Sequence, residues 1–316
     1  GENPATETFT LHLHTESQNQ QIILLEALQD KSLPHGRVGR AENGNAVLSS
    51  IKITATSTGD PSLSTAIPLT WAWADHEQKN LDFDVVNILS PNNSRGWAVD
   101  AHNVEGGRLA MLLAEQPFGY PGGTDLQVKL HYGSIYGQHS LGRVRLQSSA
   151  ISPAGLDALP VVDSRWYATW PYKPHKDDPG YDTVFGPEAE TSFDLTKKFA
   201  PDDYTWVFRG DLKDAALNTQ LPAGAIVSFA GKEFFVPSAR KLKFSLGSDD
   251  GIQVFLDGAQ VFENRVNRGV QADQDKIELD LTEGKHLLIF KVVNTGGPGG
   301  LYVKALPTKT ILQKSL

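Results

Sequence analysis

The segment between residues 131 and 139 carries side chains suited to binding a polar ligand. Tyr132, Tyr136, Gln138 and His139 lie close together in a stretch that also contains glycine. A tyrosine ring can stack on a sugar ring, while amide and imidazole groups hydrogen-bond to its hydroxyls. The segment therefore predicts a carbohydrate site, or else a loop that only closes one end of a sandwich.

Trp71 and Trp73 are a second aromatic candidate. Only Ala72 separates them, so on a strand both side chains face the same side of the sheet. If exposed, the two rings form a stacking platform for a sugar; if buried, they belong to the core, where tryptophan is mostly found. The sequence leaves both readings open.

A polar segment follows a predicted hairpin and contains Arg265, Asn267 and Arg268. Arginine and amide groups can hold sugar hydroxyls or the carboxylate of an acidic sugar. The alternative is internal pairing with Asp273 and Asp275.

Asp249 and Asp250 form an acidic pair just before Gly251. Adjacent residues of an extended chain point to opposite faces, so without a sharp turn the pair cannot act as acid and base on one substrate. In a turn, aspartate accepts backbone N–H bonds, and its oxygens also suit a structural calcium ion. A possible calcium ion is the only cofactor that we expect in this chain.

Motifs of catalysis are missing from the sequence. It has no Gly-x-Ser-x-Gly, no His-Glu-x-x-His and no phosphate-binding glycine loop leading into a helix. Without cysteine there is no thiol nucleophile, zinc–thiolate site, iron–sulfur cluster or covalent haem attachment. We expect a protein that is not an enzyme. A glycoside hydrolase or lyase is the less favoured alternative, because its carboxylates come from distant positions.

The composition and net charge of the chain predict which classes of partner are absent. The chain has 316 residues, 40% hydrophobic and 21% charged, with a net charge of −8. This composition is typical of a folded protein, and the negative charge predicts no nucleic-acid partner. No apolar run approaches the ~18 residues of a membrane span, and a signal peptide is expected to be absent or already removed.

Short alternating stretches separated by glycine, proline, asparagine and aspartate predict the fold. Residues 9–13, 125–132 and 241–246 alternate between apolar and polar side chains, which is typical of half-buried strands. We predict an all-β chain of two tandem antiparallel β-sandwich (jelly-roll) domains. They cover residues 1–150 and 188–316, and residues 151–187 form a connector rich in aromatic residues and proline.

Two groups of segments carry a resemblance to known families. Residues 247–258, 267–270, 273–275 and 291–300 resemble the galactose-binding-like jelly-roll modules of bacterial glycan-degrading and surface proteins. Residues 25–28, 32–34, 36–40, 43–48, 95–100 and 137–143 resemble the discoidin-like, carbohydrate-binding-like module pair of planctomycete-type surface proteins, which also carry a cytochrome c domain. Together the similarity covers roughly residues 8–306.

This resemblance implies a non-catalytic, glycan-binding module pair of a larger extracytoplasmic protein (periplasmic, cell-surface or secreted). Its partners would be a glycan or polysaccharide and the neighbouring domains, including the cytochrome c domain. Oligomers are possible. The alternative is a structural or docking scaffold without a sugar ligand, with the aromatic connector as its docking surface.

Overall fold

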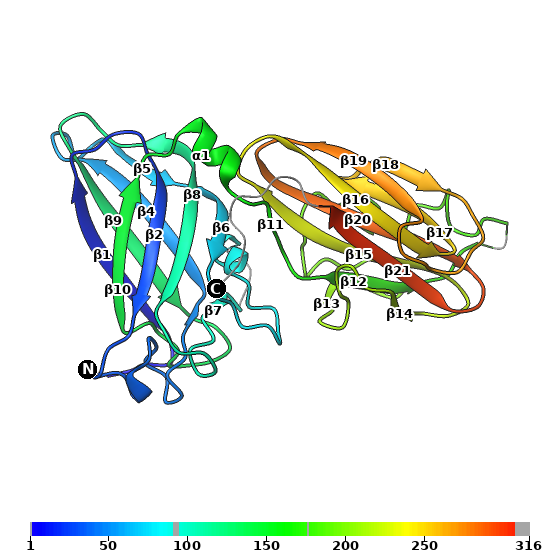
Figure 1. Ribbon diagram of the computed structural model, residues 1–316, viewed down its shortest axis with the longest axis horizontal. Helices are drawn as coiled ribbons and strands as arrows, with labels where there is room; N and C mark the ends of the chain where they lie inside the picture. The colour runs from blue at the N-terminus through cyan, green and yellow to red at the C-terminus, as the bar shows by residue number, and fades with distance from the viewer. Residues whose placement is uncertain (1, 91–94, 176, 307–316) are drawn as a thin grey trace. The chain divides into compact units, whose positions relative to one another are not determined.

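The computed structural model describes residues 2–90, 95–175 and 177–306 (Figure 1). Strands dominate, and the sheets pair antiparallel, which confirms the predicted all-β class. The chain divides into two compact units, the first ending at Val162 and the second beginning at Asp163, with β11 (Val162–Asp163) at the boundary.

Two four-stranded sheets build the first unit, with strand orders β1-β9-β4-β5 and β10-β2-β8-β6. Their strands are β1 (Glu7–Thr15), β2 (Gln20–Leu28), β4 (Ser50–Ser57), β5 (Ser64–Ile67), β6 (Leu69–Ala74), β8 (Arg108–Phe118), β9 (Thr124–Tyr132) and β10 (Arg143–Ser149). A short pair, β3 (Val47–Leu48) with β7 (Trp97–Ala98), lies beside them. Helical turns are confined to η1 (Pro34–Gly36), η2 (Val85–Leu89) and α1 (Pro153–Ala158) in the described part of this unit.

Strand β9 shows why the sequence pattern forms this core. Leu126, Val128 and Leu130 are buried, whereas the residues between them are exposed or half-buried. Successive side chains of a strand point to opposite faces, so one set of alternate positions packs inward.

The second unit also contains two sheets, with the path β13-β12-β15-β20-β17-β18 in one and β14-β21-β16-β19 in the other. These strands are β12 (Tyr167–Tyr172), β13 (Val207–Phe208), β14 (Asn218–Leu221), β15 (Ala225–Val236), β16 (Arg240–Asp249), β17 (Gly251–Leu256), β18 (Ala259–Asn264), β19 (Asp275–Leu281), β20 (Gly284–Thr295) and β21 (Gly299–Leu306), with η3 (Pro187–Ala189) between β12 and β13.

The structure differs from the predicted connector over its second part. Strand β12 pairs with β13 on one side and β15 on the other, so this segment belongs to the second unit. Tyr167 and Tyr172 are buried in the same aromatic cluster as Trp206 and Phe229. Burying each large ring contributes about 2 kcal/mol, which explains why an aromatic-rich segment joins the core.

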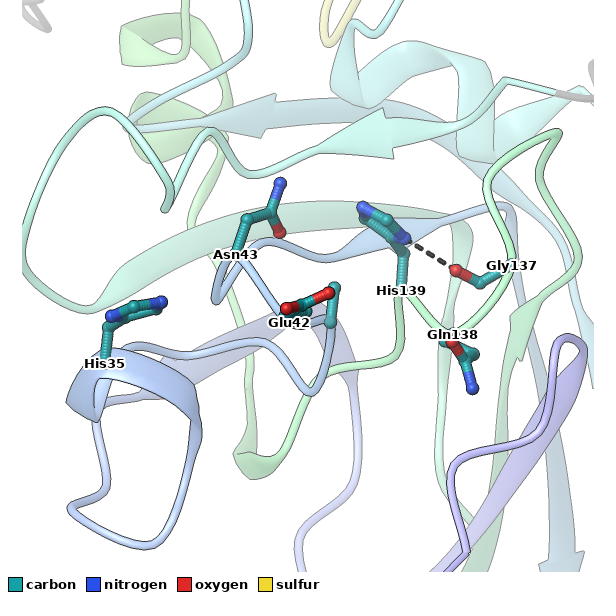
Figure 2. A pocket seen from close by; sticks show the side chains of 7 residues that line it. His35, Glu42, Asn43, Gly137, Gln138 and His139 are labelled. Carbon is teal, nitrogen blue, oxygen red and sulfur yellow. Dashed lines mark hydrogen bonds between the residues drawn. The ribbon is translucent and has the colours of Figure 1, made fainter.

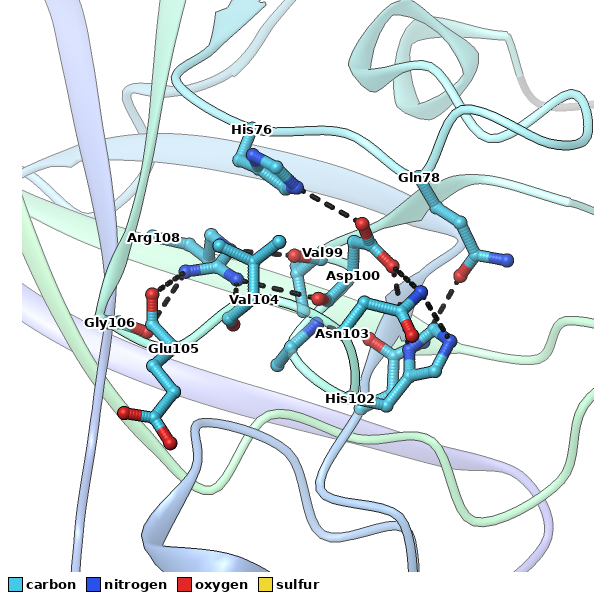
Figure 3. Close-up of polar contacts among 12 residues, drawn as sticks. His76, Gln78, Val99, Asp100, His102, Asn103, Val104, Glu105, Gly106 and Arg108 are labelled. Carbon is cyan, nitrogen blue, oxygen red and sulfur yellow. Dashed lines mark hydrogen bonds and ion pairs between the residues drawn. The ribbon is translucent and has the colours of Figure 1, made fainter. Parts of the chain in front are cut away.

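A buried arginine closes a loop of the first unit (Figure 3). Arg108 is only 4% exposed. Its guanidinium donates to the carbonyl oxygens of Val99 (2.6 Å), Val104 (2.6 Å), Gly106 (3.0 Å) and Gly107 (2.9 Å). Burial lowers the pKa of Arg108, and the negative charges of Asp75 and Asp100 oppose that shift.

None of the helices in the described part of the chain is long and apolar enough to cross a membrane.

We expect Arg108→Ala to lower the free energy of unfolding by about 3 kcal/mol, because it leaves several buried carbonyl groups without a donor. Urea unfolding measures the change. Arg143→Ala is the matched control, since that side chain is 63% exposed. Equal effects of the two substitutions would contradict a structural role for Arg108.

Candidate functional site

An open pocket of about 520 Å³ lies in the first unit (Figure 2). Two loops form it, the loop between β2 and β3 and the loop between β9 and β10. The lining residues are His35, Ala41, Glu42, Asn43, Gly137, Gln138 and His139. The pocket thus includes two of the residues that the sequence predicted for a sugar site, Gln138 and His139.

Backbone hydrogen bonds hold the two loops together. The N–H of Arg40 donates to the carbonyl of Ser140 (2.8 Å), and the N–H of Val47 donates to that of His139 (2.8 Å). Gly39 passes so close to Asn45 that a β-carbon at residue 39 would lie 1.8 Å from the Asn45 carbonyl oxygen. Only glycine permits this approach, so the walls of the pocket are set by backbone contacts.

Hydrogen bonds inside the protein fix the orientation of two lining side chains. His139 Nδ1 lies 2.8 Å from the carbonyl oxygen of Gly137. That oxygen can only accept, so Nδ1 carries the proton, and Nε2 of the neutral ring is an acceptor. Gln138 Nε2 donates to the carbonyl oxygen of Asn3 (2.8 Å), so Gln138 Oε1 is also an acceptor.

Asn43 presents the complementary group. Its Oδ1 accepts the backbone N–H of Asn45 (3.0 Å), so its amide nitrogen is the donor that remains. Asn45 Oδ1 in turn accepts the N–H of Ala101 (3.0 Å). This contact joins the pocket wall to the loop that Arg108 closes.

A polar cluster surrounds Asp100 in that same loop (Figure 3). Its carboxylate accepts from Asn103 Nδ2 (2.8 Å) and lies 3.1 Å from His76 Nε2. His102 Nδ1 is farther away, at 3.6 Å. The cluster orders the loop beside the pocket wall.

Tyr136 is a partly exposed aromatic side chain that packs on the pocket residue His139. It is 42% exposed, and its ring centroid lies 5.7 Å from that of His139 and 5.9 Å from that of Phe83. Phe83 therefore supports one side of the ring while a large part of it stays accessible.

Tyr132, by contrast, is unsuited to the predicted ligand contact. It is 3% exposed, its ring packs on Phe9 at a centroid distance of 5.1 Å, and burial raises the pKa of its phenol. Tyr132 lies an even number of residues from Leu126, Val128 and Leu130, so its side chain points to the same, inward face of β9.

The predicted tryptophan platform does not form. Trp71 is fully buried, and its indole Nε1 donates to the carbonyl oxygen of Pro160 (2.9 Å). Trp73, on the same strand, is only half-buried. Of the two possibilities left open by the sequence, core burial is correct for Trp71, because its side chain is fully buried.

Internal pairing accounts for both arginines after the hairpin. Arg268 Nη2 donates to Asp275 and to Ser248 Oγ (2.9 Å). Arg265 pairs with Asp182 (2.5 Å) and Glu263 (2.8 Å). The predicted pairing partner Asp275 is thus correct for Arg268, while Arg265 uses acids that the sequence did not indicate. Asn267 Nδ2 donates to Thr295 Oγ1 (3.3 Å).

Asp250 serves as an acceptor for two loops of the second unit. It is 4% exposed; one carboxylate oxygen accepts the N–H of Arg268 (2.8 Å), and the other accepts the N–H (2.9 Å) and hydroxyl (2.5 Å) of Thr295. Burial, and the neighbouring Asp250, raise the pKa of Asp249. This geometry fits the turn role.

Among the residues that the structure describes, no group of three or more His, Asp or Glu side chains is arranged to hold a metal ion. The calcium ion expected at Asp249 and Asp250 stays a prediction.

Several residues that line pockets were not predicted from the sequence. His35, Glu42 and Asn43 line the first pocket, and no local motif marks them. A second pocket of about 400 Å³, in the second unit, includes Trp170 and Arg209 among its lining residues. The Arg209 guanidinium lies 4.0 Å from the Trp170 ring centroid and so covers one face of it. The aromatic residues of the predicted connector, which include Trp170, are the sequence feature that could have indicated this second pocket.

No family model and no curated protein matches the chain. Solved structures with weak similarity include an anti-sigma factor domain-containing protein, with 10% identity over 96% of this chain and 80% of that chain and a TM-score of 0.29. A Pleurotus ostreatus lectin in its apo form has 10% identity over 98% of this chain and 76% of that chain (TM-score 0.21). A GH78 family rhamnosidase of Bacillus sp. GL1 has 12% identity over 92% and 31% (TM-score 0.16).

We expect Asp250→Asn to lower the free energy of unfolding by about 2 kcal/mol, because an amide N–H₂ would replace an oxygen that faces buried donors. Asp280→Asn is the control, since that side chain is 80% exposed. Thermal unfolding of both variants, followed by tryptophan fluorescence, measures the difference. If Asp250→Asn unfolds like the control, the carboxylate does not hold the loops.

Proposed function

We propose that this chain is a non-catalytic carbohydrate-binding protein and that the pocket between the β2–β3 and β9–β10 loops is its site. The observation that carries the proposal is the set of side chains gathered there. Amide, imidazole and carboxylate groups line the pocket, and the exposed ring of Tyr136 lies beside His139. Such a combination suits a polyhydroxyl ligand with one apolar ring face.

Preorganisation supports the same function. Gln138, His139 and Asn43 each have one polar atom bonded to the backbone, and the other can face a ligand. Side chains already held in place lose less conformational entropy when a ligand binds. An open pocket can therefore bind sugar hydroxyls without first rearranging its walls.

The single acid in the pocket lining favours binding over hydrolysis. Glycoside hydrolases of the usual kind place two carboxyl groups on either side of the scissile bond. Glu42 is the one acid among the described residues that line this pocket. A second carboxylate for acid–base chemistry is thus missing from that lining, which favours a non-catalytic role.

The proposal also includes the location of the chain and the domains that accompany it. The resemblance to surface-protein modules suggests an extracytoplasmic location, a longer parent protein and a neighbouring cytochrome c domain. A scaffold that binds no sugar is the alternative outcome of the test below.

We expect the purified chain to bind specific glycans in an array and polysaccharide pull-down screen, and Tyr136→Ala to weaken that binding about tenfold. The loss of stacking on one ring is worth about 1.4 kcal/mol, which corresponds to this factor. Tyr120→Ala is the matched control, because Tyr120 also lies in the first unit but its hydroxyl bonds to Thr65 (3.1 Å), whereas the Tyr136 ring packs on the pocket residue His139.

Running the screen with calcium and with a chelator separates two sites. Binding that needs calcium and is insensitive to Tyr136→Ala would move the site to the acidic turn. A folded chain that binds no glycan would overturn the proposed function and favour the scaffold.

A further inference from the structure

We propose that Glu42 is a specificity-determining residue that makes this pocket prefer neutral sugars to sugars carrying a carboxylate. The inference rests on the carbohydrate-binding function proposed above. It concerns which sugars the site accepts, and its evidence is the charge and hydrogen-bonding balance of the pocket.

Two acceptor atoms and one amide donor group are oriented in the pocket. His139 Nε2 and Gln138 Oε1 are the acceptors, because His139 Nδ1 and Gln138 Nε2 each donate to a carbonyl oxygen of the protein. The Asn43 amide nitrogen donates. The C6 hydroxyl of a neutral sugar can donate to these acceptors, whereas the ionised C6 carboxylate of a uronide has no proton to donate.

Glu42 adds a negative charge to the same opening. Figure 2 shows its carboxylate between His35 on one side and His139 with Gln138 on the other. No lysine or arginine is among the described residues that line the pocket. An anionic ligand here would approach a carboxylate without a cation beside it in the lining.

The two arginines of the same loop are already engaged with other acids. Arg40 pairs with Glu7 at 2.7 Å, and Arg37 pairs with Glu105 at 3.3 Å. Arg40 is mostly buried in that contact, with 19% of its side chain exposed, and Arg37 has 18% exposed. Neither arginine lines the pocket, so neither brings a positive charge to its opening.

Electrostatics sets the expected size of the discrimination. Two like charges at a partly solvated site repel by an amount that changes affinity about fivefold to tenfold. Screening by salt weakens this repulsion at an exposed site. The preference for neutral sugars should therefore shrink as ionic strength rises.

The test compares two pairs of methyl glycosides that differ only at C6, the β-D-glucoside with the β-D-glucuronide and the β-D-galactoside with the β-D-galacturonide. Affinities to the full chain are measured by ligand-observed NMR at pH 8. We expect a neutral member to bind about fivefold to tenfold more tightly than its uronide. Glu42→Gln should remove that ratio by raising the affinity for the uronide.

A gain of uronide binding cannot result from a damaged fold. Glu115→Gln removes the same charge from an exposed position of β8 that does not line the pocket, and it should leave the ratio unchanged. Equal binding of both members by the wild type, an unchanged ratio in Glu42→Gln, or an equal change in Glu115→Gln overturns the inference. Failure of both neutral glycosides to bind also overturns the inference. The proposed function is tested separately, by the polysaccharide screen.

Discussion

Buried polar side chains bonded to loop backbone hold this protein together in the absence of cysteine. Arg108 supplies donors to a whole loop of the first unit, and Asp250 supplies acceptors to two loops of the second. Lys291, 1% exposed, donates in the same way to the carbonyl oxygen of Thr183 (2.8 Å). A β-sandwich leaves unpaired peptide groups where its strands end, and burying those groups without partners is costly. One charged side chain satisfies several of them at once.

The candidate site depends on this arrangement. The loop closed by Arg108 contains Ala101, whose N–H bonds to Asn45, and Asn45 orients Asn43 at the pocket. A series of hydrogen bonds thus connects the buried Arg108 loop to the Asn43 side chain at the pocket opening. A rigid support of this kind matters for recognition, because affinity for a flexible polar ligand is easily lost to the ordering of the protein.

Part of the site could be predicted from the sequence, and part could not. Gln138 and His139 were predicted to lie together, because they are neighbours in one loop between two strands, and both do line the pocket. Tyr132 was misjudged, although the parity of Leu126, Val128 and Leu130 already predicts that a strand continued to residue 132 buries it. The burial of Trp71 but not of Trp73 depends on the packing around β6, which alternation alone does not report.

The sequence by itself determined the all-β class and the inward face of the clearly alternating strands, because alternation and turn residues are local properties of the chain. Tertiary structure alone decided that the loop carrying Glu42 and Asn43 lies against the loop carrying Gln138 and His139. It also decided that the segment from Tyr167 to Tyr172 is a strand within the second unit rather than a connector. The reason is that partners distant in sequence are chosen by the register of paired strands and by the burial of whole side chains, and neither is written in a short window of residues.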